Sequence, residues 1–311
     1  MRMLMTHDVG FTPEMYDAFA AAGIEPVFLS GPDSQSYDEL DFSDIDAVFC
    51  YRFFCYNDIS RFPSLKYIHT TSSGIDHMPL EYIRSHGIVL DNARGVYSVP
   101  MAEFALGAVL QLYKHMNRLR RQQAEHRWQM LDAAETRELS GRVVTILGAG
   151  SVGTECAKRF SAMGCRCIGL CRHPRDAEYF ESVRRIDELD ALLPETDILL
   201  LTLPLSDETR HIIDARRFGL LKPGAVLVNI ARGPVADNAA LLEALRSGHL
   251  SGALADVFDE EPLPPESPLW DVENLIVTPH SSFLGEHNPQ RMFDLVYKDT
   301  VNWMKTQGGC E

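Results

Sequence analysis

The sequence predicts an α/β protein of two domains, each a doubly wound parallel sheet covered by helices. Three observations predict this fold. Short apolar runs alternate with stretches of helical spacing along most of the 311 residues, as in parallel strands joined by helices. A glycine-rich turn joins one such run to a helical stretch at 148–153. Another helical stretch, at 289–304, follows the last apolar run. We therefore expect a domain at 100–281, inserted between residues 1–99 and residues 282–311.

Residues 1–99 are expected to form the smaller sheet. Its apolar runs are short and are separated by polar or helical segments, which favours parallel strands. The predicted strands lie at 3–6, 26–29, 47–50, 65–70 and 88–90, and a helix at 13–22 ends at Gly23.

Two polar loops follow strands of this first domain. One contains Tyr51 and Arg52, and the other contains Ser73 and Gly74. Ligands of open α/β sheets bind beyond the carboxyl ends of the strands, and a Ser-Ser-Gly turn can direct consecutive backbone N–H groups at a carboxylate. These four residues are therefore candidate substrate ligands. The alternative is that each loop is an ordinary polar turn.

Residues 100–281 have the size and rhythm of a larger doubly wound sheet. About six strands are expected, at 143–147, 167–170, 198–203, 225–230, 254–258 and 275–278. A helix is expected at 237–246 because Gly248 follows its last turn, and a stripe of apolar residues predicts another over 101–119.

The end of that second helix leads into a strongly polar stretch, 118–128, which closes with Trp128. A charged arm that carries an exposed aromatic side chain is typical of contacts between subunits. The alternative is a solvated helix end.

The turn at 148–153 is a G-x-G-x-x-G motif set between the strand at 143–147 and a helix, with another strand at 167–170. In that setting the motif predicts a dinucleotide site. Gly148 allows the tight turn, Gly150 lets the backbone approach a pyrophosphate, and Gly153 lets helix and strand pack closely. Ser151 and Val152 open the helix, where free N–H groups favour phosphate. The alternative is a glycine turn that binds nothing.

The residues after the next strand indicate which dinucleotide is preferred. An NAD enzyme usually carries Asp or Glu there to hold the ribose 2′-OH, but the residue eighteen positions after Gly153 is the neutral Cys171. Arg172, His173 and Arg175 follow it. Guanidinium groups form charge-assisted bonds to a 2′-phosphate, so we predict a preference for NADP(H), with NAD(H) still usable. The alternative is a solvated basic loop.

Three charged residues follow strands of this domain. Arg232 follows 225–230, Glu261 follows 254–258, and His280 follows 275–278, so all three are expected at the sheet edge that carries the glycine turn. Reducing a 2-keto acid needs a hydride on carbon and a proton on oxygen. His280 can supply the proton, Glu261 can hold the ring, and Arg232 can bind the substrate carboxylate. Each of them alone could be structural or a surface charge.

Composition limits the remaining possibilities. The net charge of −15 disfavours nucleic acid and anionic membranes as partners. Seven cysteines without a C-x-x-C pair indicate a reduced protein without a metal site. The N-terminal stretch does not fit a signal peptide, and no apolar run reaches 18 residues, so we expect a cytoplasmic protein.

Taken together, these motifs resemble the D-isomer-specific 2-hydroxyacid dehydrogenase family, which includes glyoxylate/hydroxypyruvate reductases. The matching segments are GAGSVG, PLSDETRHII, NIARGPV, ALADVFDEEPLP and VTPHSS. The resemblance implies a Rossmann nucleotide-binding domain inserted into a flavodoxin-like substrate domain. It implies Arg232, Glu261 and His280 as the catalytic set, with Ser73 and Gly74 on the substrate carboxylate. It also implies a homodimer in which Trp128 of one subunit lines the substrate pocket of the other.

The resemblance extends the expected cofactor site beyond the glycine turn and the basic loop. The added residues follow the strands of the larger sheet: Leu203, Pro204, Thr209, Ile230, Ala231, Asp256 and His280.

We therefore predict an NADP(H)-preferring reductase that converts small 2-keto acids to D-2-hydroxy acids. Glyoxylate and hydroxypyruvate are the substrates that the resemblance suggests, while aromatic side chains at 51, 53 and 54 would also allow a bulkier keto acid. One alternative is a dinucleotide-sensing binding protein of the same fold, like a transcriptional corepressor. The absence of an added interaction tail argues against it. The other is a related dehydrogenase acting on formate or phosphite.

Overall fold

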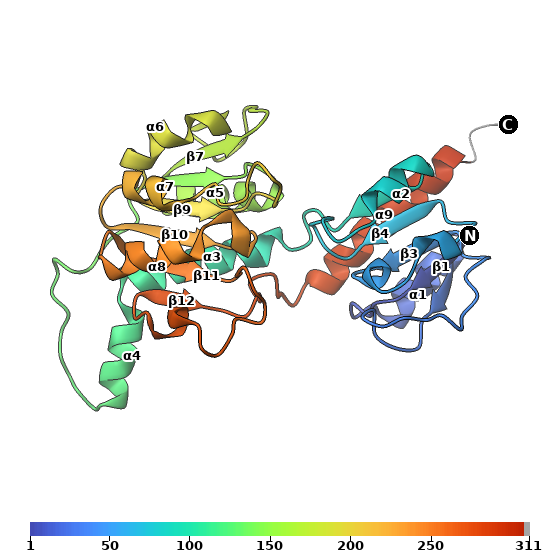
Figure 1. The fold of residues 1–311 in the computed structure, drawn as a ribbon, viewed down its shortest axis with the longest axis horizontal. Coiled ribbons are helices and arrows are strands. Elements are labelled where there is room, and N and C mark those ends of the chain that lie inside the picture. The colour runs from blue at the N-terminus through green and yellow to red at the C-terminus, as the bar shows by residue number, and fades with distance from the viewer. Residues whose placement is uncertain (308–311) are drawn as a thin grey trace. The chain divides into compact units, whose positions relative to one another are not determined.

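The computed structural model describes residues 1–307, and the chain divides into two compact α/β units (Figure 1). The first unit comprises Met1–Tyr97 and Gly285–Glu311, and the second comprises Ser98–Leu284. The sequence placed the two crossings at 99/100 and 281/282. Both units contain only parallel sheets, which confirms the predicted fold class.

The first unit contains a five-stranded parallel sheet in the order β2-β1-β3-β4-β5. Its strands are β1 (Arg2–Met5), β2 (Glu25–Phe28), β3 (Ala47–Cys50), β4 (Tyr67–Thr70) and β5 (Val89–Asn92). Helices α1 (Pro13–Ala21) and α9 (Asn288–Gln307) contribute to one core layer, and α2 (Leu80–Ser85) contributes to the other. This strand order is the flavodoxin-like arrangement.

The second unit contains a seven-stranded parallel sheet in the order β12-β11-β10-β9-β6-β7-β8. Its strands are β6 (Val143–Leu147), β7 (Arg166–Cys171), β8 (Ser182–Arg185), β9 (Ile198–Leu201), β10 (Ala225–Asn229), β11 (Leu250–Ala255) and β12 (Leu275–Val277). Its helices are α3 (Ser98–Tyr113), α4 (Met116–Ala124), α5 (Ser151–Ala162), α6 (Leu189–Leu192), α7 (Ala215–Leu220) and α8 (Asn238–Arg246). Because the order reverses at β6, the crevice for a ligand lies beyond the carboxyl end of that strand.

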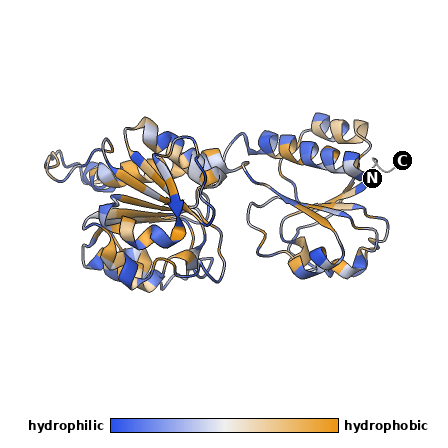
Figure 2. Cartoon of the chain, turned by 90° about the horizontal axis from the view of Figure 1, so that it is seen from above, coloured by the Kyte–Doolittle hydropathy of each residue, from blue (hydrophilic) through white to orange (hydrophobic). Residues whose placement is uncertain are grey.

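Each sheet is buried on both faces because alternate strand residues enter separate core layers. In the second unit, Leu199 and Leu201 belong to the layer under α7 and α8, whereas Ile198 and Leu200 belong to the layer under α3 and α5. Figure 2 shows the same pattern, with hydrophobic colour concentrated on the strands of each unit. Within the described residues no helix is both long and apolar enough to span a membrane.

The second unit differs from the prediction in three places. The expected single helix over 101–119 is two helices, because the chain leaves α3 after Tyr113 and His115 takes the left-handed conformation, with a φ of 49°. The expected six strands are seven, because the edge strand β8 is polar and gives no apolar run. The strand predicted at 254–258 begins earlier, at Leu250, and ends at Ala255.

Asp197 joins three segments of the second unit at the start of β9. Its buried carboxylate accepts hydrogen bonds from the Val143 N–H at 3.0 Å and from Lys222 Nζ at 2.7 Å, and lies 3.4 Å from the Arg142 guanidinium. Burial alone would raise the pKa of Asp197, but the bonds from Lys222 and Val143 and the two positive charges lower it overall.

We predict that Asp197→Asn destabilises the fold by about 1–3 kcal/mol at pH 7, because charge-assisted bonds are lost in a buried place. The pKa is lower in the folded chain than in the unfolded chain, where about 3.9 is usual. The carboxylate therefore stabilises the fold above that pH, and the contribution is lost as pH falls through the folded-state pKa. Urea denaturation at pH 7 and at about pH 3.5 should show the difference from wild type shrinking at the lower pH. Asp187→Asn, at an exposed acid paired with Arg185, is the control. An equal difference at both pH values would contradict this account.

Candidate active site

The glycine turn has the geometry of a phosphate site. Gly148 has a φ of 109°, and a Cβ there would lie 2.8 Å from the Leu203 N. A Cβ on Gly153 would lie 2.0 Å from the Gly148 oxygen, whereas Gly150 faces open space. In α5 the first described intrahelical donor is the Thr154 N–H, which binds the Gly150 carbonyl at 2.9 Å. The preceding N–H groups of the helix are therefore available to an anion.

The basic loop lies at the end of β7, as predicted. Cys171 is the last strand residue, and Arg172, His173 and Arg175 are exposed. The Arg172 guanidinium lies 3.3 Å from the Glu208 carboxylate, in an ion pair whose side chains are both more than half exposed. The sequence analysis missed Glu208, which sits in the loop after β9 and competes with any phosphate for this arginine.

The loop after β9 uses its polar groups to hold itself against the glycine turn. Thr202 donates its hydroxyl to the Gly148 carbonyl at 2.8 Å. Thr209 donates to the Pro204 carbonyl at 2.8 Å and accepts from the Ser206 N–H at 2.7 Å. Among the predicted cofactor residues, Thr209 therefore shapes the loop, while Leu203, Ile230 and Ala231 are buried at strand ends.

His280 and Glu261 lie together at the carboxyl edge of the second unit. His280 Nδ1 is 2.7 Å from Glu261 Oε2, and Glu261 Oε1 accepts from the Phe258 N–H at 3.0 Å. Burial alone would raise the pKa of Glu261, but these hydrogen bonds and the Arg232 charge lower it. The carboxylate is therefore ionised beside the imidazole at neutral pH.

Asp256 holds the turn that carries His280. Its side chain is fully buried, and its oxygens accept from Thr278 Oγ1 at 2.6 Å, from the Ser281 N–H at 2.9 Å and from the Ser282 N–H at 3.0 Å. The His280 N–H binds the Asp256 carbonyl at 2.8 Å, and His280 has a φ of 49°. The carboxylate predicted to bind cofactor is thus engaged within the protein, and it fixes the backbone of the histidine.

Arg232 is placed by a close approach of two loops. A Cβ on Gly233 would lie 1.9 Å from the Phe258 carbonyl carbon, so only glycine fits where the loops after β10 and β11 touch. Asn229 donates its amide to the Arg232 carbonyl at 3.2 Å, and the guanidinium donates to the Ala231 carbonyl at 2.8 Å. The strands β10, β11 and β12 are neighbours in the parallel sheet, so the three predicted catalytic residues that follow them lie at one edge. The charge of Arg232 also lowers the pKa of Glu261.

In the first unit, the loop after β4 presents consecutive free backbone donors. Ser73 donates its hydroxyl to the Ala93 carbonyl at 3.2 Å, and Ser72 donates to the Gly74 carbonyl at 2.6 Å. The N–H groups of Ser73, Gly74 and Ile75 have no acceptor among the described contacts of this unit. The prediction had named only the first two.

Phe53 and Phe54 are less exposed than Tyr51. Phe53 is fully buried, and Phe54 packs edge-on against Phe53 and Phe62. A bulkier keto acid therefore cannot contact Phe53, whereas Phe54 is half-buried. Tyr51 remains exposed.

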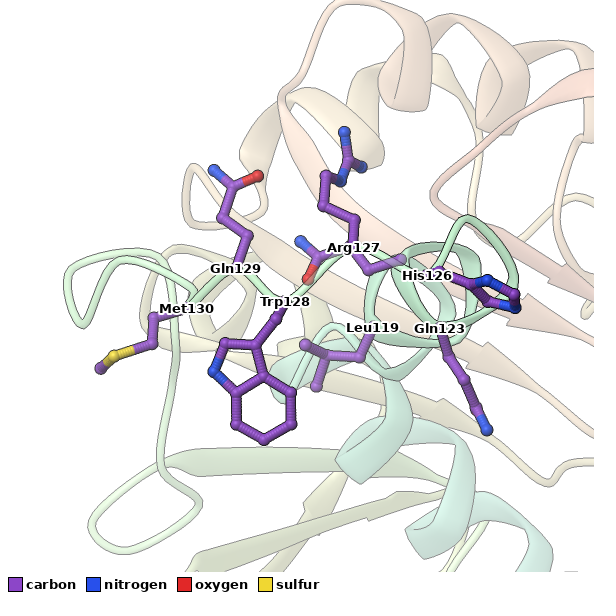
Figure 3. A pocket seen from close by; sticks show the side chains of 8 residues that line it. Leu119, Gln123, His126, Arg127, Trp128, Gln129 and Met130 are labelled. Carbon is purple, nitrogen blue, oxygen red and sulfur yellow. The ribbon is translucent and has the colours of Figure 1, made fainter.

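The charged arm projects from the second unit beyond α4 (Figure 1). Trp128 is completely exposed and Met130 is 85% exposed. Figure 3 shows both at a pocket formed by α4 and the chain that follows it, lined by Leu119, Gln122, Gln123, His126, Arg127, Trp128, Gln129 and Met130. Contact of Trp128 with a second subunit stays a prediction.

Known proteins resemble this chain in sequence and in structure. Residues 106–282 match the family model described as the D-isomer specific 2-hydroxyacid dehydrogenase, NAD binding domain. A glyoxylate reductase of Thermofilum pendens is 33% identical over 78% of this chain and 73% of its own length. A glyoxylate/hydroxypyruvate reductase A of Arabidopsis thaliana is 34% identical over 76% of this chain and 75% of its own length.

A solved structure gives the same result over nearly the whole chain. The NADPH-dependent glyoxylate/hydroxypyruvate reductase of Sinorhizobium meliloti, in complex with NADP and sulfate, superposes with a TM-score of 0.79 at 30% identity. The match covers 98% of this chain and 95% of that one.

The family match and the solved structure support an oxidoreductase that binds a nicotinamide dinucleotide. The chain belongs to the D-isomer-specific 2-hydroxyacid dehydrogenase family, and its named relatives support a reductase of 2-keto acids.

We predict that Asp256→Asn lowers both stability and turnover. In the variant, the asparagine NH₂ faces a backbone N–H that binds the Asp256 carboxylate in the wild-type protein. That N–H loses its acceptor, and an unsatisfied buried donor costs about 1–3 kcal/mol. Thermal unfolding and steady-state reduction of glyoxylate measure the two effects. Asp259→Asn, at an exposed acid on the neighbouring loop, is the matched control. An Asp256→Asn protein as stable and as fast as wild type would refute the role given to this carboxylate.

Proposed function

We propose that this protein reduces 2-keto acids to D-2-hydroxy acids, with His280 as the proton donor. The observation that carries the proposal is the 2.7 Å contact between His280 Nδ1 and Glu261 Oε2. Asp256 holds the backbone of this histidine in place. With Nδ1 bonded to an ionised carboxylate, Nε2 carries the proton that is given to the carbonyl oxygen. Glu261 stabilises the positive charge of the ring before the transfer.

Arg232 acts on the same substrate in this proposal. Its planar fork can bind a carboxylate through two parallel bonds, and its charge also stabilises the negative charge that grows on the carbonyl oxygen during reduction. Ser73 and Gly74, together with Ile75, offer backbone N–H groups to a substrate carboxylate. These roles suit an anionic substrate with a neighbouring carbonyl group.

The residues of the second unit fit a nicotinamide dinucleotide. Gly150 faces open space, and the start of α5 presents unused N–H groups to a pyrophosphate. When bound, the reduced nicotinamide supplies the hydride. We propose a preference for NADP(H), because the end of β7 carries Cys171 rather than a carboxylate and Arg172 stands beside it.

We also propose that two copies of the chain associate through the arm after α4. Trp128 is completely exposed there, and large exposed aromatic side chains mark contact surfaces. In this proposal Trp128 of one copy reaches the substrate pocket of the other.

We predict that His280→Gln lowers kcat for 2-keto acid reduction by roughly 10²- to 10⁴-fold, the usual contribution of a positioned acid. Single-turnover oxidation of bound NADPH measures the chemical step, and a fluorescence titration checks that NADPH still binds. His287→Gln, which changes a 70% exposed histidine paired with Glu286, is the matched control. Turnover close to wild type in His280→Gln would remove this residue from the mechanism.

We predict that Cys171→Asp with Arg172→Ile moves the preference from NADPH towards NADH by roughly tenfold or more, because a charge-assisted bond is exchanged for repulsion. The kcat/KM ratio for the two cofactors measures it. Glu208→Gln should act in the opposite direction, since it releases Arg172 from its ion pair. Unchanged ratios in both variants would discredit the assignment of Arg172.

A further inference from the structure

Three loops of the first unit leave its sheet at one level. Cys50 of β3, Thr70 of β4 and Asn92 of β5 are paired in register. Two residues beyond these strand ends stand Arg52 and Arg94, on either side of the loop that carries the free N–H groups. Neighbouring strands lie about 4.8 Å apart, so the chain segments that carry the two arginines leave the sheet from the strands on either side of that loop.

Asn92 ties Arg94 to the loop of free donors. Its side-chain NH₂ donates to the Ser73 carbonyl at 2.9 Å, and its side-chain oxygen accepts from the Arg94 N–H at 3.3 Å. The Ala93 N–H also binds the Ser72 carbonyl at 3.0 Å. The backbone of Arg94 is therefore held beside the loop that we propose binds the carboxylate.

Arg52 is fixed in a comparable way on the other flank. The Asp33 carboxylate, 7% exposed, accepts from the Tyr51 N–H at 2.7 Å and from the Arg52 N–H at 3.3 Å. This acid thus holds the backbone of the loop. Cys55 beside the Arg52 guanidinium raises the pKa of this arginine.

Arg52 and Arg94 are both exposed, and neither guanidinium is paired with a carboxylate among the described residues. Two other arginines of this unit are paired with carboxylates: Arg2 with Asp44 and Glu25, and Arg61 with Asp38. In a chain of net charge −15, two cations without a carboxylate partner, beside a row of free N–H groups, make a local site for anions.

We propose that the substrate is a 2-keto acid with a second anionic group. This inference rests on the proposed function, in which the N–H groups of Ser73, Gly74 and Ile75 bind the first carboxylate. Arg94 binds the second anion, and Arg52 adds positive potential from the other side. The separation of neighbouring strands, together with the length of an arginine side chain, suits a substrate whose two anionic groups are a few bonds apart. A dicarboxylic keto acid of four or five carbons, or a sulfonate of the same length, meets this condition.

The test compares substrates that differ only in the terminal group. Oxaloacetate is paired with 2-oxobutanoate, and 2-oxoglutarate with 2-oxopentanoate, so that a carboxylate replaces a methyl group in chains of equal length. For the wild-type protein with NADPH we expect kcat/KM to be roughly 10- to 100-fold higher for the better dicarboxylate than for its partner, the worth of a charge-assisted contact.

Variants then locate the contact. Arg94→Met should remove most of that ratio, and Arg52→Met a smaller part of it. Arg84→Met is the matched control, since Arg84 is an exposed arginine in the last turn of α2, which leads to the start of β5 at the opposite edge of the sheet. It removes the same charge from the same unit and should leave the ratio at its wild-type value.

The outcomes separate the two claims. Equal or better use of the monocarboxylates, or a ratio that Arg94→Met leaves intact, would overturn the second-anion site while the reductase stands. Failure of all keto acids with the wild-type protein would overturn the proposed function and this inference with it.

Discussion

The fully buried carboxylate of Asp256 is the constraint on which the candidate site depends. A buried carboxylate is costly unless it is satisfied, and here donors from 278 to 282 satisfy it. The same contacts force the chain to turn directly after β12 and hold His280 in a left-handed conformation. The ring can then meet Glu261 at 2.7 Å. The buried carboxylate of Asp256 thus fixes the position of the His280 imidazole at the edge of the sheet.

The parallel sheets explain why so many functional candidates lie together. All strands of a parallel sheet end at one edge, so loops that are far apart in sequence converge there. In the second unit this brings together the glycine turn, Arg232, Glu261 and His280. In the first unit the same rule places Arg52, the loop of Ser73 and Arg94 in one row. The side chains in the loops determine function, because the strands of both sheets consist mainly of buried apolar residues.

Much of this could be predicted from sequence because its signals are local. Apolar runs bounded by glycine marked the buried strands, and the spacing of Gly148, Gly150 and Gly153 marked the nucleotide turn. The rest depends on tertiary contacts. The polar edge strand β8 has no apolar run, and the break at His115 lies inside a continuous apolar stripe. No sequence pattern indicates that Arg172 pairs with Glu208 or that Phe53 is buried in the core. None indicates that the Asp256 carboxylate is bound by groups of the protein itself. The role of each site residue remains a proposal.

The central claim is that a hydride and the proton of His280 are added to one defined face of a 2-keto acid. It is tested most directly by incubating the wild-type protein with NADPH and a panel of 2-keto acids and resolving the products on a chiral column. The account predicts NADPH oxidation matched by formation of the D-2-hydroxy acid. An L product, a racemic product, or no oxidation with any member of the panel would contradict it.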